Sequence, residues 1–313
     1  MILIISNKKD IHIEKVAWWL DQNNSKYIIF DPNIDSFEFS SEGLFFNIEN
    51  LKVNIDQVIS IWYRKPVTIL FPNESLPKYF YQEYANKSNK ILYEYLSKNK
   101  SVYMLNRFDD MSTAGNKILQ LDLAKKIGLM TPITTITNNP KNIKIDDYQM
   151  VLKPLSGGNY FSEKGITLLG TKLITQKDID NFEPKISNLP QIFQQKINKQ
   201  FELRITIVGN QVFAVKIHSK KCEEDNIVDT RFVYKELYHT IFDLPQEIHD
   251  KLLILMKKLC LDYGAIDMIV DQNSNYYFLE INPNGQWLWL ENMTNVPISK
   301  SIAEILMNPP VRV

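Results

Sequence analysis

Near its C-terminal end, the sequence sets carboxylates into two apolar runs where core residues are expected. Glu280 and Asn282 lie within residues 276–285, and Asp267 lies within residues 265–270. Side chains alternate between the faces of a strand, so Glu280 and Asn282 point the same way. The polar stretch between the runs is typical of a turn, and the resulting hairpin would bring three oxygen donors together, as Mg²⁺ requires. The alternative, that Asp267 and Glu280 are exposed or paired with lysine, is disfavoured by such apolar neighbours.

The composition of the chain excludes several classes of protein. Its 313 residues exceed what one hydrophobic core usually serves, so we expect two or three domains. Its 36 basic and 36 acidic side chains cancel, which gives no global attraction to nucleic acid or to a membrane. No stretch reaches transmembrane length, and the N-terminus is interpreted as a buried strand rather than a signal peptide. The separated Cys222 and Cys260, and four histidines without zinc spacing, fit a reduced, cytoplasmic protein.

The first hundred residues alternate strand and helix patterns, which predicts a parallel sheet. The expected elements are strands at 2–5, 27–30 and 58–64, helices at 11–23 and 76–99, and short β-like runs around 37–48. At the end of the last strand, residues 62–66 put Arg64 and Lys65 beside two aromatic side chains. This cluster is either packing with a solvated basic edge or part of a functional site.

From residue 105 onward the pattern changes. The expected elements are a helix at 116–127, strands at 149–154, 166–169, 191–197 and 201–217, a helix at 245–262, and the carboxylate hairpin. Gly128 ends the first helix, and Pro132 begins an extended segment. We find no internal repeat and no low-complexity linker.

Two lysines are candidates for binding phosphate. Lys153 ends an apolar strand just before a loop that contains Gly157 and Gly158, whose backbone N–H groups can approach an anion. The three oxygen donors make Lys153 a stronger candidate, because Mg²⁺ and phosphate chemistry needs charges of both signs. Lys117 opens the helix at 116–127, where a cation is unfavourable for the helix dipole. It therefore either reaches a ligand or is simply solvated.

Polar side chains on the intervening strands complete the candidate set. Backbone groups near Gln195 and Ile197, at a strand end, are placed to read an adenine edge. Glu202 and Arg204 share a strand face, so they either pair with each other or bind a ribose and an oxyanion. The remaining candidates for stabilising negative charge are Lys216 and His218 on one strand face and Arg231 in a polar segment.

In their order along the chain, these features resemble the ATP-grasp superfamily over about residues 105–295. The resemblance implies an α/β (α+β) fold with an N-terminal pre-ATP-grasp domain at 1–104, a central lobe at 105–190 and a C-terminal lobe at 191–313. It implies ATP and Mg²⁺ as cofactors. The implied ligands are Lys117, Lys153, Gly157 and Gly158 for the phosphates, Gln195, Ile197 and Glu202 for adenosine, and Asp267, Glu280 and Asn282 for the metal.

Five short segments narrow the resemblance to the graspetide synthetases, the microviridin-type peptide ligases, with the grasp-with-spasm maturases as one branch. These segments are 61–66, 105–107, 131–134, 201–204 and 229–231. The resemblance implies an ATP-dependent macrocyclase that activates Glu or Asp side chains of a precursor peptide as acyl phosphates. It would join them to Ser or Thr hydroxyls as ω-esters, or to Lys amines as ω-amides. The implied partner is a ribosomal peptide whose leader binds the central lobe, and a homodimer is one oligomeric state to consider.

The chain departs from the superfamily pattern at one position. Many ATP-grasp ligases carry arginine two residues before the metal-binding aspartate, where this chain has Ala265. The oxyanion role then falls to Arg204 or Arg231, with Lys216 and His218 as further catalytic candidates.

The sequence pattern leaves two alternative functions to consider. The first is a RimK-like amino-acid or protein C-terminal ligase that forms peptide bonds. The second is a nucleotide-binding regulatory protein without catalysis, which the intact metal triad disfavours. The sequence leaves open ester against amide, the number and order of rings, and the leader sequence.

Overall fold

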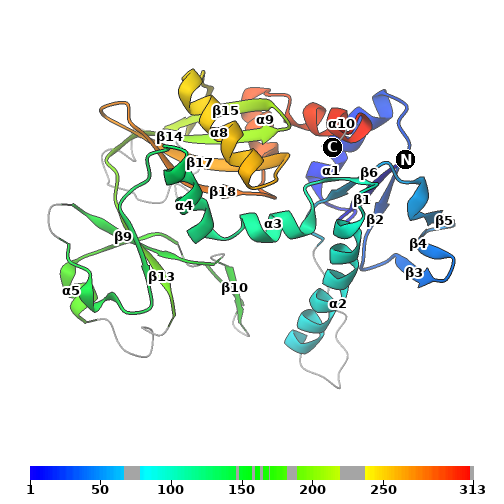
Figure 1. Ribbon diagram of the computed structural model, residues 1–313, viewed down its shortest axis with the longest axis horizontal. Helices are drawn as coiled ribbons and strands as arrows, with labels where there is room; N and C mark the ends of the chain where they lie inside the picture. The colour runs from blue at the N-terminus through cyan, green and yellow to red at the C-terminus, as the bar shows by residue number, and fades with distance from the viewer. Residues whose placement is uncertain are drawn as a thin grey trace.

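The fold has an N-terminal α/β domain, a central lobe and a C-terminal lobe (Figure 1). The computed structural model describes residues 1–66, 78–145, 148–156, 159–162, 165–168, 170–181, 189–218 and 237–310. Helix α3 (Phe108–Ala114) bridges the N-terminal domain to the other two bodies. The mixed α/β architecture expected from the sequence is confirmed.

The N-terminal domain is built on a parallel sheet of order β2-β1-β6-β7, as predicted. Its strands are β1 (Ile2–Ile5), β2 (Tyr27–Phe30), β6 (Ser60–Tyr63) and β7 (Tyr103–Leu105), and its helices are α1 (Ile11–Gln22) and α2 (Lys78–Lys98). A small antiparallel sheet of β3 (Ser36–Ser40), β4 (Gly43–Ile48) and β5 (Leu51–Asn54) leads into the 3-10 turn Ile55–Gln57. The Asp10 carboxylate starts α1 by accepting the backbone N–H of His12.

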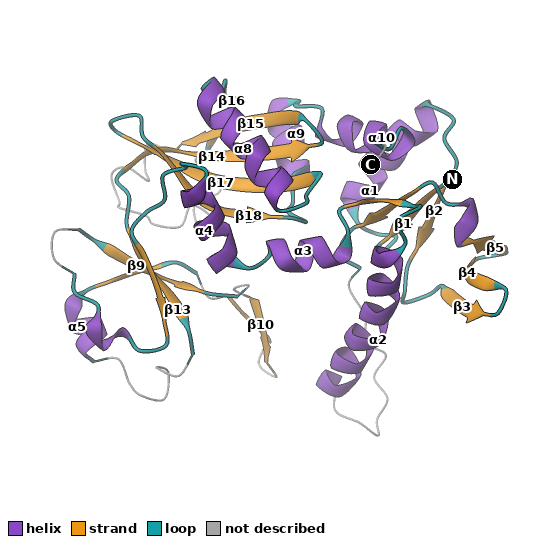
Figure 2. Cartoon of the chain, viewed as in Figure 1, coloured by secondary structure: helices purple, strands orange, loops and turns teal. Residues whose placement is uncertain are grey.

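The central lobe holds an antiparallel sheet of order β12-β9-β13-β8 and a separate hairpin (Figure 2). The sheet contains β8 (Thr134–Thr137), β9 (Met150–Pro154), β12 (Lys172–Ile174) and β13 (Gln191–Gln195). The hairpin is β10 (Asn159–Ser162) with β11 (Gly165–Leu168), and the short helices are Pro140–Asn142 and α5 (Gln176–Asp180). Strand β13 pairs with β9 and β8, although the sequence boundary at 190 assigned it to the C-terminal lobe. We therefore propose that the lobes meet after Gln195.

The C-terminal lobe is an antiparallel sheet of order β16-β15-β14-β17-β18. Its strands are β14 (Lys199–Val208), β15 (Gln211–His218), β16 (Tyr238–Ile241), β17 (Tyr263–Asp271) and β18 (Tyr276–Asn282). The helices around it are α4 (Lys117–Lys126), α8 (Gln246–Lys258), α9 (Leu288–Thr294) and α10 (Ile298–Met307). The hairpin predicted for Asp267 and Glu280 is confirmed, because the two residues lie directly opposite each other.

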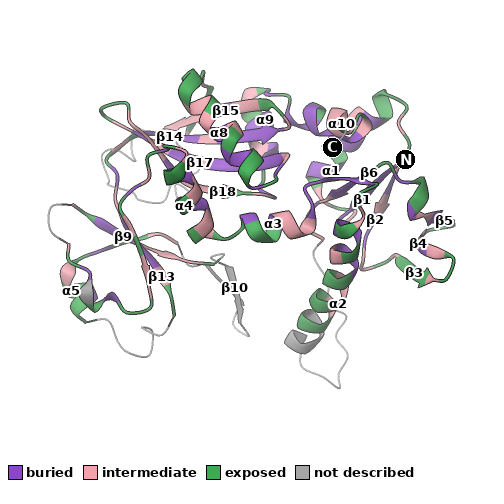
Figure 3. Cartoon of the chain, viewed as in Figure 1, coloured by how far each residue is buried: buried purple, intermediate pink, exposed green. Residues whose placement is uncertain are grey.

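Two hydrophobic cores determine how the N-terminal domain and the C-terminal lobe are held together. One lies beneath the C-terminal sheet, where α4 and α8 cover residues such as Leu203, Met268 and Phe278. The other joins Ile4 and Trp62 of the N-terminal domain to Trp287 and Ile302 beyond β18. Strands β14 and β17 of the C-terminal sheet are accordingly largely buried, whereas much of the described part of α2 is exposed (Figure 3). The N-terminal domain is thus packed against the C-terminal lobe through a shared core. Over the described residues, no helix has both the length and the apolar character needed to cross a membrane.

Candidate active site

Strand β18 contains a bulge at the position that matters most for the predicted metal ligands. Asp267 lies opposite Glu280, whereas Met268 lies opposite Phe278, so Leu279 has no partner across the pair. An extra residue in one strand switches the phase of its alternation. The bulge therefore changes which side chains of β18 face the core.

The consequence is visible in the packing on either side of the bulge. Phe278 and Ile281 both belong to the core beneath the sheet, although they are three residues apart. Glu280 and Asn282 therefore lie on the opposite face, with Asp267. Strict alternation from Phe278 would have turned Glu280 into the core, so the bulge is what presents the carboxylates to the cleft.

Each carboxylate meets one cation. Arg204 Nη1 donates to Asp267 Oδ1 at 2.8 Å, from the adjacent strand β14. Lys117 Nζ lies 2.9 Å from Glu280 Oε2. Lys117 is the first residue of α4, whose start is fixed by the Asn116 side chain accepting two backbone N–H groups. The helix position that disfavours a cation is thus offset by a charge partner. For Glu280 this is the pairing with lysine that the apolar neighbours in the sequence had disfavoured.

The two carboxylates are held in different protonation environments. Burial raises the pKa of Asp267; the charge of Arg204 opposes this shift, and the charge of Glu280 adds to it. Burial also acts to raise the pKa of Glu280, but Lys117, Lys153 and Arg204 together lower it below its usual range. A divalent cation between the two would relieve their repulsion.

A buried glutamine holds β18 in place along the edge that faces away from β17. Gln120 Nε2 donates to the carbonyl oxygens of Ala114 at 2.6 Å and Ile281 at 2.9 Å. Its Oε1 accepts the N–H of Ile281 at 2.9 Å. The side chain therefore takes the place of a neighbouring strand at the residue between Glu280 and Asn282. Because Gln120 lies one turn after Lys117 on α4, it also fixes Lys117 relative to Glu280.

The N-terminal domain holds the loop that follows the metal ligands. Arg64 is buried, and its Nη1 donates to Asn284 Oδ1 at 2.9 Å and to the carbonyls of Asn284 at 3.1 Å and Gly285 at 3.2 Å. Asn106 donates to the carbonyls of Tyr263 and Pro283, both at 2.8 Å. Both side chains come from segments that carried the sequence resemblance, and both hold backbone in place. Sequence reasoning gave neither this role.

Arg204 fills the space left by Ala265. A β-carbon at Gly285 would lie 2.4 Å from Cβ of Ala265 and 2.9 Å from Arg204 Nη2. The guanidinium lies across this glycine and donates to the carbonyl of Gln286 at 3.1 Å. A small residue at 265 and a glycine at 285 thus make room for an arginine from a neighbouring strand. Arg204 is therefore the candidate oxyanion donor that lies beside the carboxylates.

Lys153 reaches the carboxylate cluster from the central lobe. Its Nζ donates to Gln194 Oε1 at 2.8 Å. Burial lowers the pKa of Lys153, while the charges of Glu280, Asp267 and Glu202 oppose that shift. The predicted phosphate lysines from two lobes are thus brought to one place. Glu202 does not pair with Arg204, because its Oε1 lies 2.6 Å from Lys199 Nζ.

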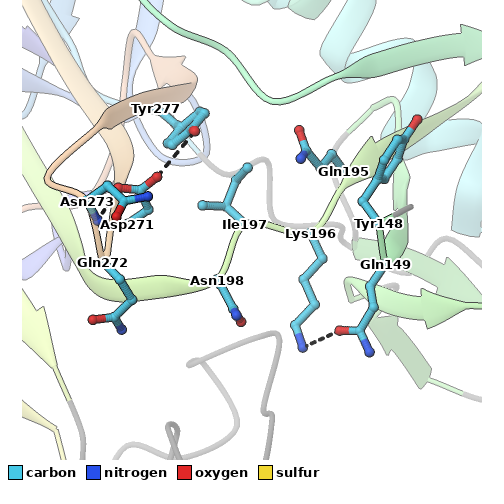
Figure 4. A pocket seen from close by; sticks show the side chains of 10 residues that line it. All are labelled: Tyr148, Gln149, Gln195, Lys196, Ile197, Asn198, Asp271, Gln272, Asn273 and Tyr277. Carbon is cyan, nitrogen blue, oxygen red and sulfur yellow. Dashed lines mark hydrogen bonds between the residues drawn. The ribbon is translucent and has the colours of Figure 1, made fainter. Parts of the chain in front are cut away.

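A pocket of about 470 Å³ lies at the hinge between β13 and β14 (Figure 4). It contains two predicted adenosine ligands, Gln195 and Ile197, which lie between Tyr277 on one side and Tyr148 on the other. The full lining is Tyr148, Gln149, Gln195, Lys196, Ile197, Asn198, Asp271, Gln272, Asn273 and Tyr277. Its volume falls within the range of small-molecule sites. Glu202 is not part of the lining, so the predicted adenosine set is not gathered in this one pocket.

The structure does not bring the remaining described candidates to the carboxylates. Lys216 lies directly opposite Leu203, and its Nζ lies 4.2 Å from the centre of the Phe201 ring. Those neighbours face the core beneath the sheet, away from Arg204. His218 shares the face of Lys216 and lies beside Tyr238, with ring centres 5.6 Å apart. The catalytic role expected for Lys216 and His218 therefore has no geometric support. Arg231, Gly157, Gly158 and Cys222 lie outside the described residues.

The donor set suits a hard cation. Over the described residues, no three His, Cys, Asp or Glu side chains are grouped for a metal, and the candidate ligands are two carboxylates and an amide. Asn282 Oδ1 accepts the N–H of Asn284 at 3.0 Å, which orients the amide. Oxygen donors and mutual repulsion between Asp267 and Glu280 fit Mg²⁺, which keeps several waters and binds through few carboxylates and substrate phosphates.

Comparison with known proteins identifies close relatives. A family model described as a RimK-like ATP-grasp domain matches residues 114–306. The structure is similar to that of macrocyclase MdnC from Microcystis aeruginosa MRC, bound with precursor peptide MdnA, at a TM-score of 0.87 and 32% identity over 99% of this chain and 100% of that chain. None of the curated proteins matches the chain.

Two further structures support the same relationship. The RiPP-associated ATP-grasp ligase of Chryseobacterium gregarium, in complex with ADP and a leader and core peptide, has a TM-score of 0.85 and 30% identity over 99% of this chain and 97% of that chain. Macrocyclase MdnB from Microcystis aeruginosa MRC has a TM-score of 0.78 and 25% identity over 98% of this chain and 99% of that chain.

Proposed function

Because the chain belongs to the RimK-like ATP-grasp family, and is therefore an ATP-dependent ligase that uses Mg²⁺, we propose that it closes macrocycles in a ribosomally made precursor peptide. The observation that carries this proposal is the full-length likeness to MdnC and to the Chryseobacterium ligase, both solved with peptides. The likeness includes the N-terminal domain, whereas the family model itself begins at residue 114. The substrate is thus a peptide rather than a free amino acid.

The residues on each side of the cleft divide the chemistry. Lys117 and Lys153 bind the phosphates of ATP, and Asp267, Glu280 and Asn282 bind Mg²⁺, which neutralises charge on the transferred phosphoryl group. A carboxylate oxygen of the peptide forms a bond to the γ-phosphorus while the bond to the bridging oxygen breaks, and ADP leaves with the electron pair. A hydroxyl or amine then attacks the acyl carbon, and phosphate leaves. Each ring closure therefore removes the mass of one water from the peptide.

Arg204 suits the second step of this reaction. It lies beside Asp267 and over Gly285, where developing negative charge on the acyl oxygen needs a donor. Arg231 is the other candidate for this role.

We place the leader of the peptide on the central lobe, because that lobe is joined to the rest of the protein at a hinge and contains a free hairpin. An extended peptide offsets its loss of entropy by pairing with strand edges or grooves. Binding is local rather than driven by net charge, which is zero. A homodimer is compatible with this arrangement. No nucleic acid or membrane partner is part of the proposed function, and the proposed location is the cytoplasm.

The test uses peptides encoded beside the gene of this enzyme, incubated with enzyme, ATP and Mg²⁺ and followed by mass spectrometry. Ring closure removes one water for each bond, whereas a RimK-like amino-acid ligase would add the mass of a residue. A leaderless core is expected to react slowly and to recover partly when the leader is added separately. Mass gain in place of water loss would favour the alternative ligase.

A further inference from the structure

Lys65 is a cation next to the active site that none of the roles above uses. Over the described residues it forms no hydrogen bond and no ion pair, whereas Arg204 and Lys117 are paired with carboxylates and Arg64 is bound to backbone carbonyls. Its side chain keeps access to solvent, although the atoms packed around it partly desolvate the ammonium. A cation held at a site without a partner is placed to receive an anion.

The backbone at Lys65 is strained. Its φ of 39° lies in the left-handed region, which costs a residue with a side chain about 1–3 kcal/mol. The preceding residue is fixed by the hydrogen bonds of Arg64 to Asn284 and Gly285, and Pro66 follows. The strained residue thus directly follows the side chain that joins the N-terminal domain to the loop after the metal ligands. Such strain accumulates at binding sites, where it orients a side chain.

The surroundings of Lys65 are rich in positive charge. Burial lowers the pKa of its ammonium, the charges of Arg64 and Arg204 lower it further, and Asp10 opposes them. Both guanidiniums donate to the same loop, Arg64 to the carbonyl of Gly285 and Arg204 to that of Gln286. The N-terminal domain and the C-terminal lobe thus gather three cations around residues 284–286.

The anion at this place is distinct from the nucleotide. The cation that reaches the carboxylate pair from the central lobe is Lys153, on which Glu280, Lys117 and Asp267 act most strongly. Lys65 is influenced instead by Arg64, Arg204 and Asp10. The two lysines therefore come from different bodies of the protein and have different charged neighbours. Because the proposed function assigns the phosphates of ATP to Lys153 and Lys117, an anion beside Lys65 and Arg204 is a different group, and the acidic side chain of the peptide is the remaining anion of the reaction.

We propose that Lys65, together with Arg204, binds the acidic side chain of the substrate and holds the acyl phosphate formed from it. The inference rests on the proposed function and names the residue that selects a carboxylate as the group to be activated. Lys65 offsets the repulsion between the incoming carboxylate and the phosphates of ATP. The N-terminal domain thereby contributes directly to the reaction, and a neutral glutamine or asparagine at the same peptide position is excluded because it leaves the cations without a counter-charge.

The test compares Lys65→Met, Lys65→Gly and Lys65→Arg with the wild type, using the precursor peptide identified by water loss. A charge-assisted contact contributes about 1.5–3 kcal/mol, and the exposed position puts this contact at the low end, so Lys65→Met is expected to raise KM for the peptide about tenfold. Affinity for Mg²⁺ and ADP, measured by calorimetry, stays unchanged. Lys65→Arg keeps most of the peptide affinity. Lys100→Met, at an exposed lysine far along the chain, is the matched control.

The glycine variant separates charge from backbone strain. Glycine adopts a φ of 39° without penalty, so Lys65→Gly folds normally and still shows the KM defect if the cation is what matters. A wild-type KM in both Lys65→Met and Lys65→Gly, or a defect in Lys65→Met that Lys65→Gly repairs, would overturn the inference. A wild type that converts no ATP to ADP with any acidic peptide would overturn the proposed function, and this inference with it.

Discussion

Asp267 and Glu280 face each other across two strands, yet their surroundings assign them different tasks. Glu280 is held ionised by lysines from two lobes, whereas Asp267 retains a proton more readily because its one cation does not offset burial and the neighbouring charge. The pair is therefore destabilised until a divalent cation arrives. Binding of Mg²⁺ relieves the repulsion between the two carboxylates, so this repulsion increases the affinity of the site for Mg²⁺.

The metal assignment predicts the behaviour of two single substitutions. Glu280→Gln and Asn282→Ala are expected to abolish turnover and the Mg²⁺-dependent part of ADP binding, because each removes an oxygen ligand. The fold should survive, since Gln120 and the paired backbone hold β18 independently of these side chains. Thermal unfolding and calorimetry with ADP, with and without Mg²⁺, test this, and Glu42→Gln serves as the control. Near-wild-type turnover at saturating Mg²⁺ would refute the assignment.

A second prediction concerns pH and Asp10, which supports Arg64 through an ion pair in which Oδ2 lies 3.5 Å from Arg64 Nε. Burial acts to raise the pKa of Asp10, but hydrogen bonds from His12 and the charge of Arg64 lower it below the ordinary value. A lowered carboxylate pKa contributes stability that is present above the unfolded pKa of about 3.9 and is lost as pH falls through the folded value. Asp10→Asn keeps the helix cap and is expected to cost about 1 kcal/mol near neutral pH.

The measurement is urea unfolding of both proteins between pH 7 and pH 3. The gap in unfolding free energy should stay constant down to about pH 5 and close below about pH 4. A gap that widens in acid would mean that Asp10 does not support Arg64 in the way described.

The carboxylates and the two lysines predicted to bind phosphate could be singled out from residue identity, because each is costly to bury without a partner. Their partners were not predictable, since pairing is set by register between distant strands. Arg204 shows this: Glu202 is its nearest acidic neighbour in sequence, but Asp267 is its neighbour in space. Lys216 and His218 were chosen for shared strand face alone, and the structure puts that face toward the core.

At the scale of elements, the hairpin followed from apolar runs and a polar turn, but its bulge did not. Strands are expected to alternate, so no interruption at Leu279 was predicted. The signal that existed was the spacing of Phe278 and Ile281, two large core residues three positions apart in one strand. The C-terminal helices α9 and α10 were also missed.

The close approach of β17 to the loop after β18, at Ala265 and Gly285, predicts a compensating pair of substitutions. Gly285→Ala places a methyl group against Cβ of Ala265 and against the Arg204 guanidinium, so turnover and stability should both fall. The double variant Gly285→Ala with Ala265→Gly removes the closer clash and is expected to recover most of the stability. Recovery of stability is followed by thermal unfolding. Additive losses in the double variant would show that the contact with Ala265 is not the cause.

At the scale of the whole molecule, the boundary expected near residue 104 separates bodies that share a core. Sequence cannot show this, because the residues involved are some two hundred positions apart and each reads as ordinary core. Trp287 is almost fully buried between the N-terminal domain and the C-terminal lobe. The two bodies are therefore expected to unfold together, and the central lobe separately.

Hydrogen exchange of Trp287→Ala tests this coupling. Removal of such a side chain costs about 3–5 kcal/mol. Protection should fall in β1 and β6 of the N-terminal domain as well as in the C-terminal helices, while β9 and β13 of the central lobe keep theirs. Unchanged protection in β1 would contradict a shared core. Leu189→Ala, at an exposed leucine, is the matched control.

The way the central lobe is attached has a practical consequence. The strand that enters it, β8, pairs with the strand that leaves it, β13, and the N–H of Gln195 donates to the carbonyl of Ile133 at 2.8 Å. Its two ends therefore lie side by side, as in a module inserted into a host, although Ile136 of β8 packs against the core beneath the C-terminal sheet. Exchanging residues 134–195 for the matching piece of another family member should leave the metal ligands and Lys117 with the host, and transfer Lys153, Gln195 and the choice of leader with the insert. A chimera that still prefers the leader of its host would show that the residues that recognise the leader lie outside 134–195.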